Sequence, residues 1–116
     1  SAQDLSGLTG MAESRSLARP PARLQLFAAY PNPFNPSTVL RFTVPAALQS
    51  GNIQVTIFNS LGQRVRLLFN GKVRSAENQV RWNGLSDQGR QMASGLYFAV
   101  LRAGSFRQSQ KLLLLK

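Results

Sequence analysis

Only two carboxylates, Glu77 and Asp87, follow residue 23, and the chain contains neither histidine nor cysteine. Glycosidic hydrolysis needs two carboxyl groups at a controlled separation, and a serine nucleophile needs an adjacent general base. A Ser–Lys pair would need a buried lysine, whereas Lys72 follows a turn sequence and Lys116 is the last residue of the sequence. The residue types therefore predict a protein that is not an enzyme.

One loop contains two side chains that metal sites use, Asn83 and Asp87. Together with backbone carbonyls they could bind calcium, which prefers several oxygen ligands. The alternative is that each forms an Asx turn with its own backbone. We favour the turns because no other carboxylate lies close by in the sequence. We expect no metal ion and no cofactor.

The net charge of +10 comes from 14 basic and 4 acidic residues. Within the predicted strands, Arg41, Arg64, Arg66 and Arg81 fall on the polar phase, which places them on outer faces. Such a surface keeps a protein soluble, but it also attracts anionic glycolipid or nucleic acid. Nucleic acid is the least favoured partner because no aromatic residues alternate with these arginines.

Carbohydrate binding would require exposed aromatic rings. Trp82 shares the apolar phase of its strand with Val80, so we expect it in the core. Tyr30 and Phe34 flank a proline-rich corner, and we expect both to close one end of the fold.

The chain of 116 residues is long enough for one domain. Residues 1–23 contain scattered Gly and Pro and predict a linker, and residues 24–116 predict the folded domain. No run approaches the roughly 20 apolar residues of a membrane span, and the first twenty residues do not resemble a signal peptide. Because the sequence starts with Ser-Ala, we expect a piece of a longer protein.

Short runs of alternating apolar and polar residues fill the domain. They predict strands at 24–28, 38–44, 52–58, 63–69, 76–82, 96–102 and 105–115. The run at 96–102 is apolar on both faces and predicts a central strand. Gly62 and the Asn70-Gly71 pair predict hairpin turns. This spacing predicts an all-β, seven-stranded antiparallel sandwich, immunoglobulin-like or fibronectin-like.

Four sequence strings carry a resemblance to a known family. They are Tyr30-Pro-Asn-Pro-Phe-Asn-Pro-Ser-Thr38, Phe58-Asn-Ser-Leu-Gly-Gln-Arg-Val65, Ala93-Ser-Gly-Leu-Tyr-Phe98 and Lys111-Leu-Leu-Leu-Leu-Lys116. In this order they resemble the type A C-terminal sorting domain of the type IX secretion system. The related immunoglobulin-like domain of flagellar hook-capping proteins has Trp-Asn-Gly, Asp-x-x-Gly and Ser-Gly-x-Tyr patterns, of which this sequence matches the first and third and reads Asp87-Gln-Gly89 at the second. The resemblance covers about residues 28 to 116.

The resemblance implies a delivery tag at the end of a larger exported protein. The cargo would pass through the periplasm to the cell surface or the medium. The outer-membrane translocon and its shuttle protein would recognise the tag. In family members a sortase-like peptidase removes the tag and joins the cargo to anionic lipopolysaccharide, while other cargoes are released.

Ten residues match the family motifs, and the resemblance assigns them to sorting or recognition. They are Pro31, Asn32, Pro33, Phe34, Gly62, Val65, Gly95, Tyr97, Lys111 and Lys116. Each also has a structural interpretation. The prolines make the corner rigid, and Tyr97 can anchor by burying its ring and bonding its hydroxyl. The two lysines protect a leucine run from aggregation, unless an exposed last strand pairs with a partner's sheet edge.

A carbohydrate-binding or other surface-adhesion accessory module of a secreted enzyme is the alternative function. Retention by a glycan would favour it over a sorting domain, and salt-sensitive binding of an oligonucleotide would instead favour nucleic acid. The sequence leaves the cargo and the oligomeric state open.

Overall fold

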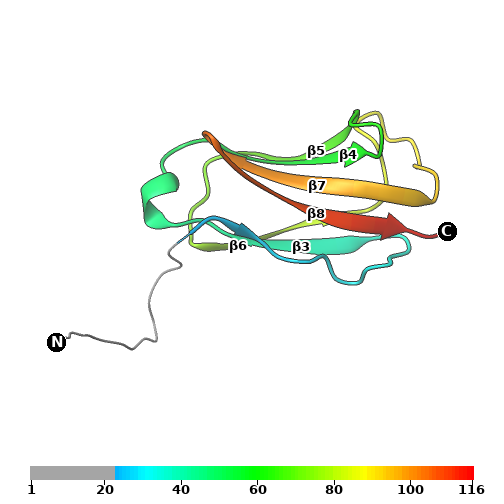
Figure 1. Ribbon diagram of the computed structural model, residues 1–116, viewed down its shortest axis with the longest axis horizontal. Helices are drawn as coiled ribbons and strands as arrows, with labels where there is room; N and C mark the ends of the chain where they lie inside the picture. The colour runs from blue at the N-terminus through cyan, green and yellow to red at the C-terminus, as the bar shows by residue number, and fades with distance from the viewer. Residues whose placement is uncertain (1–22) are drawn as a thin grey trace.

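The computed structural model describes residues 23–116, which form two β-sheets packed face to face (Figure 1). The strands are β2 (Gln25–Leu26), β3 (Thr38–Thr43), β4 (Ile53–Asn59), β5 (Arg64–Gly71), β6 (Glu77–Trp82), β7 (Gly95–Ala103) and β8 (Phe106–Leu114), and a 3-10 turn, η1 (Ala46–Leu48), follows β3. The sheets have the orders β2-β3-β6 and β5-β4-β7-β8, with every neighbouring pair antiparallel. The predicted seven-stranded sandwich is confirmed. Except for residue 23, the predicted linker lies outside the described residues.

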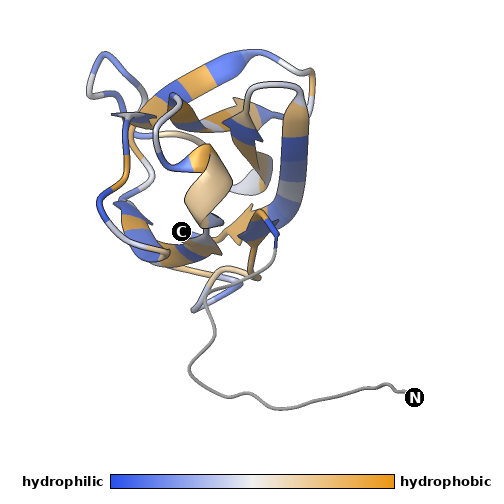
Figure 2. Ribbon diagram, turned by 90° about the vertical axis from the view of Figure 1, so that its left-hand side faces the viewer, coloured by the Kyte–Doolittle hydropathy of each residue, from blue (hydrophilic) through white to orange (hydrophobic). Residues whose placement is uncertain are grey.

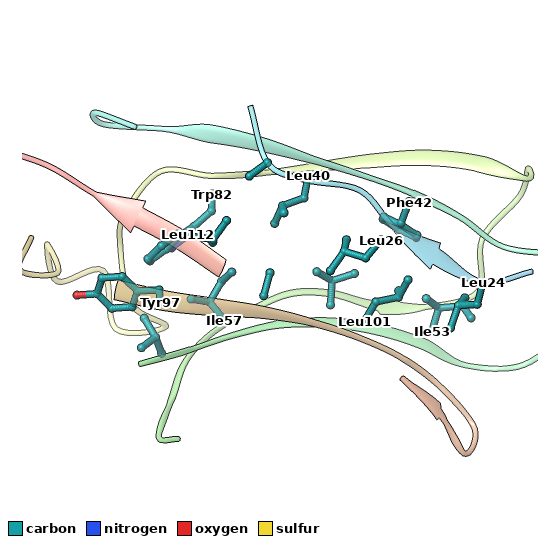
Figure 3. Close-up of a cluster of buried hydrophobic side chains, with 14 of the residues drawn as sticks. Leu24, Leu26, Leu40, Phe42, Ile53, Ile57, Trp82, Tyr97, Leu101 and Leu112 are labelled. Atoms are coloured by element: carbon teal, nitrogen blue, oxygen red, sulfur yellow. The ribbon is translucent and has the colours of Figure 1, made fainter. Parts of the chain in front are cut away.

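The core forms where one face of each sheet meets the other (Figure 3). The period-two alternation places Leu40 and Phe42 of β3 opposite Ile57 of β4 and Leu101 of β7, all of them buried. Strand β7 lies between β4 and β8, as its two apolar faces predicted. Trp82 is fully buried at the end of β6, which confirms its predicted place in the core.

Strand β5 departs from strict alternation. The sequence predicted Val65, Leu67 and Phe69 on one face, but the register with β4 shifts twice along the pair. Because each shift moves side chains to the other face, Leu68 packs against the core with Phe69, and Leu67 does not. Val65 remains buried. A bulge of this kind leaves no mark in the spacing of apolar residues.

The predicted hairpin turn at Asn70-Gly71 is wrong. Both residues belong to β5, where Gly71 has a φ of 157° and pairs with Ile53. The Asn70 side chain instead accepts a hydrogen bond from Asn52 Nδ2 at 2.8 Å. The chain then crosses to the other sheet, so β5 and β6 are not a hairpin. By contrast, Gly62 has a φ of 80° and closes the β4–β5 turn as predicted.

Two glutamines join the sheets at one side of the sandwich. Strand β2 is an edge strand, and among the described residues no strand pairs with the side of β2 that faces away from β3. The Leu26 N–H donates to Gln108 Oε1 at 3.1 Å, and the Leu26 carbonyl accepts from Gln110 Nε2 at 2.9 Å. Side-chain amides of β8 thus take the place of a neighbouring backbone.

Candidate functional site

One end of the sandwich, the motif end, gathers the ends of β4, β6 and β8 and the starts of β3, β5 and β7. It comprises residues 30–37, 60–63, 83–94 and 115–116 and is the right-hand end in Figure 1. Most of the ten motif residues lie in it or next to it. The motif end itself contains Pro31, Asn32, Pro33, Phe34, Gly62 and Lys116. The strands that start there contain Val65, Gly95 and Tyr97 among their first residues, and Lys111 lies in β8, three residues before the end of that strand. The structure therefore brings together strings that the sequence separates by up to eighty residues.

The Asn32 side chain pairs with the outer edge of β8. Its Nδ2 donates to the Lys111 carbonyl at 3.1 Å, and its Oδ1 accepts from the Leu113 N–H at 2.9 Å. One amide side chain thereby occupies two backbone groups that a neighbouring strand would use. The first and last strings are bonded to each other here, which gives Asn32 a physical task that its sequence position did not disclose.

Phe34 continues this contact with its backbone. Its N–H donates to the Leu113 carbonyl, and its carbonyl accepts from the Leu115 N–H, both at 3.0 Å. The proline corner therefore covers the last part of β8. The edge of β8 at Lys111–Leu115 is not exposed, so it is not available to pair with a partner's strand. The remaining outer groups of β8 lie nearer its start.

Three aromatic rings pack together in the core beneath the motif end, and Figure 3 shows two of them, Trp82 and Tyr97. Phe34 is 2% exposed, with its ring centroid 5.5 Å from that of Trp82, and Trp82 meets Tyr97 edge to face at 5.1 Å. The Tyr97 hydroxyl donates to the Ala93 carbonyl at 2.6 Å, and burial raises the pKa of this hydroxyl above its ordinary value. The prediction for Tyr30 is wrong, because its side chain is 81% exposed. The backbone of Tyr30 bonds to Val39, and this pairing leaves its ring outside.

The middle string forms a self-bonded turn. Asn59 Oδ1 accepts from the N–H groups of Leu61 and Gln63 at 3.0 and 2.9 Å. The residues therefore serve the turn itself, and Leu61 projects from its tip with 81% exposure. Gly62 makes the turn possible, and Val65 places its side chain in the core.

Asp87 fastens the loop after β6 to the outer edge of β5. Its backbone N–H donates to the Val65 carbonyl at 2.8 Å, and its Oδ1 accepts from the Leu67 N–H at 3.0 Å. Its Oδ2 accepts from Arg64 Nε at 2.9 Å. The Leu67 N–H, and after it the Arg64 guanidinium, holds the pKa of the Asp87 carboxyl below its ordinary value. The predicted Asx turn is correct for Asn83, which accepts from the Leu85 N–H, but Asp87 bonds to a distant strand instead.

Gly84 is a residue of this end that sequence reasoning did not select. It has a φ of 79°, and a Cβ at this position would lie 3.3 Å from the Pro36 carbonyl oxygen and 3.7 Å from Leu114. The loop, the corner and the last strand meet here around a pocket of about 220 Å³ that Lys116 also lines. The Trp-Asn-Gly pattern was the available signal.

The two lysines of the last string occupy different places. Lys111 is exposed on the outer face of β8, opposite Phe98 of β7. Lys116 is held by its backbone, whose N–H donates to Ser94 Oγ at 2.9 Å. Residues 23–116 contain no cluster of three or more metal-ligating His, Cys, Asp or Glu side chains. Within the same residues, no helix has the length and apolar character that crossing a membrane requires.

Comparison with known proteins places the fold among immunoglobulin-like domains. A solved structure described as dimeric latent PorU from Porphyromonas gingivalis is similar with a TM-score of 0.57 and 20% identity. The match covers 75% of this chain and 9% of that one, so the chain corresponds to a small part of the larger protein. No curated protein matches the sequence. The family model of the FlgD Ig-like domain matches residues 33–105, more than half of the sequence, and the chain therefore belongs to the FlgD Ig-like domain family.

Proposed function

We propose that this chain is a non-catalytic sorting domain that directs a larger cargo through the outer membrane by the type IX secretion system. The observation that carries the proposal is the meeting of the first and last strings through Asn32, Phe34 and β8. An immunoglobulin-like fold and likeness to part of a PorU structure are compatible with this assignment. The partners would be the translocon and its shuttle protein, and the destination the cell surface or the medium.

Export of a reporter fused ahead of residue 1 tests the proposal. Deleting residues 110–116 would remove the buried Leu112 and Leu114 and unfold the domain, so point variants are preferable. We expect Lys111→Ala combined with Lys116→Ala to leave most of the reporter in the periplasm, because the two changes remove part of the proposed recognition motif. The fold should be retained, because both side chains are exposed and bury no core. Lys72→Ala, at the opposite end, is the matched control. Surface delivery of the double variant at the level of the unchanged chain would contradict the proposal.

One observation favours a carbohydrate-binding accessory module as the second candidate. The outer face of the four-stranded sheet has a depression of about 360 Å³ that Phe58 and Phe98 line, with Asn59 and Ser109 beside them. Half-exposed rings beside hydrogen-bonding groups suit a sugar ring. Retardation in polysaccharide gels that Phe98→Ala abolishes would support this function, and equal mobility with and without polysaccharide would dismiss it.

A further inference from the structure

A third concave site lies at the end of the sandwich opposite the motif end. Figure 2 views this end, where η1 crosses the opening between the sheets. The pocket there has a volume of about 540 Å³, within the range typical of small-molecule sites. Its walls include Leu24, Pro45, Leu48 and Phe106, and the Phe106 side chain is 58% exposed. Such a lining would take up an apolar group.

Two arginines, Arg23 and Arg107, line the same pocket. Arg107 is the direct cross-strand partner of Arg102, and both side chains are exposed. Like charges in this position repel each other and weaken the strand pair. Arg107 lines both this pocket and the outer-face depression described above, and an anion bound beside it in the pocket would relieve this repulsion.

No described carboxylate is placed to perform that task. Within residues 23–116 the carboxylates are Glu77 and Asp87. Asp87 bonds to Arg64 at the motif end, in the one ion pair between residues of this part of the chain. Glu77 lies opposite Thr43 in the three-stranded sheet, whereas Arg102 and Arg107 belong to the four-stranded sheet.

We propose that this pocket binds a free single-chain anionic amphiphile, of the class of fatty acids and alkyl phosphates. The hydrocarbon chain would lie against Leu24, Leu48 and Phe106, and the anionic head would lie beside Arg23 and Arg107. A pocket of about 540 Å³ has room for one alkyl chain, and a concave pocket suits a single chain better than the flat surface of a bilayer. The site lies at the far end from the motif strings, so it is independent of the sorting function proposed above.

Titration of the full 116-residue chain with decyl phosphate, kept below its micelle concentration, tests the proposal. We expect one equivalent to bind and to move the amide resonances of Leu48 and Phe106. Inorganic phosphate lacks the apolar chain and decyltrimethylammonium has the opposite charge, so each should bind at least about tenfold more weakly. Binding only to anionic vesicles, equal binding of the cationic amphiphile, or no binding would each overturn the proposal.

Matched variants locate the binding. Phe106→Ser and Arg107→Gln should each weaken decyl phosphate binding about tenfold, since each removes one contact of an exposed side chain. Leu61→Ser and Arg81→Gln remove an exposed apolar group and an exposed charge elsewhere, and should leave the affinity within about twofold. All four variants should keep the thermal midpoint of the unchanged chain. If the two pairs of variants lose affinity equally, the amphiphile binds elsewhere and the assignment fails.

Discussion

In this domain, single polar side chains make hydrogen bonds to strand edges that a neighbouring backbone would otherwise make. The Asn32 side chain bonds to one carbonyl and one N–H of β8. The Asp87 carboxylate accepts from one N–H of β5, and the Asp87 backbone N–H donates to a carbonyl of the same strand. Both residues sit at an outer edge of the same four-stranded sheet. Unpaired strand edges invite association with other strands, and these two residues occupy edge groups that another strand would use.

Asp87 gives a prediction in pH. Its pKa is lowered on folding from an unfolded value near 3.8, so the bonds stabilise the fold fully above that value. The contribution is lost as the pH falls through the still lower pKa of the folded state. We expect Asp87→Ala to lower the urea midpoint at pH 7 and to lower it less at about pH 2, because protonation of the carboxyl removes its contribution as the pH falls. Glu77→Gln is the control, and an effect of Asp87→Ala that is equal at the two pH values would contradict this role.

Trp82 gives a prediction in packing. The ring is fully buried between Phe34 and Tyr97, and its Nε1 donates to the Leu85 carbonyl at 2.9 Å. Trp82→Ala should lower the free energy of unfolding by about 3–5 kcal/mol because it leaves a cavity. Trp82→Phe keeps an aromatic ring and should cost less. Equilibrium urea unfolding measures both, and equal losses would show that the indole volume is not what matters.

At the scale of elements, the proline corner and β8 act as one unit. Asn32→Ala should remove about 1 kcal/mol of stability and should speed hydrogen exchange at the Leu113 amide, which loses its acceptor. Asn35→Ala, in the same corner, is the control. Hydrogen-exchange spectra that leave Leu113 as protected as before would show that the edge is closed by other means.

Strand β2 likewise depends on hydrogen bonds from two side chains of β8. Replacing both Gln108 and Gln110 by Ala leaves the Leu26 N–H and carbonyl without these partners. We expect a loss of about 1–2 kcal/mol, concentrated in β2. Exchange of the Leu26 amide should rise, while that of Leu101 in the central strand follows only global unfolding. Equal acceleration at both amides would mean that the glutamines support the whole core and not one strand.

At the scale of the whole molecule, periodicity was sufficient for the sandwich, the central strand and the buried Trp82. It failed where the backbone departs from regularity. The shifts in β5 moved Leu67 out of its predicted face, and Asn70-Gly71 continues a strand because tertiary pairing with Ile53 overrides a local turn preference. The motif end was predictable as a set of strings but not as contacts, because the Asn32 bonds join residues some eighty positions apart and such pairings leave no local signal.

The path of the chain gives the domain a direction. Residue 23 lines the pocket of about 540 Å³, and the motif strings lie at the other end of strands up to nine residues long. At about 3.3 Å per residue, the two ends are about 30 Å apart. In the proposed sorting function, the described chain thus starts at one end of the domain, and the motif end would stay accessible to a receptor at the other.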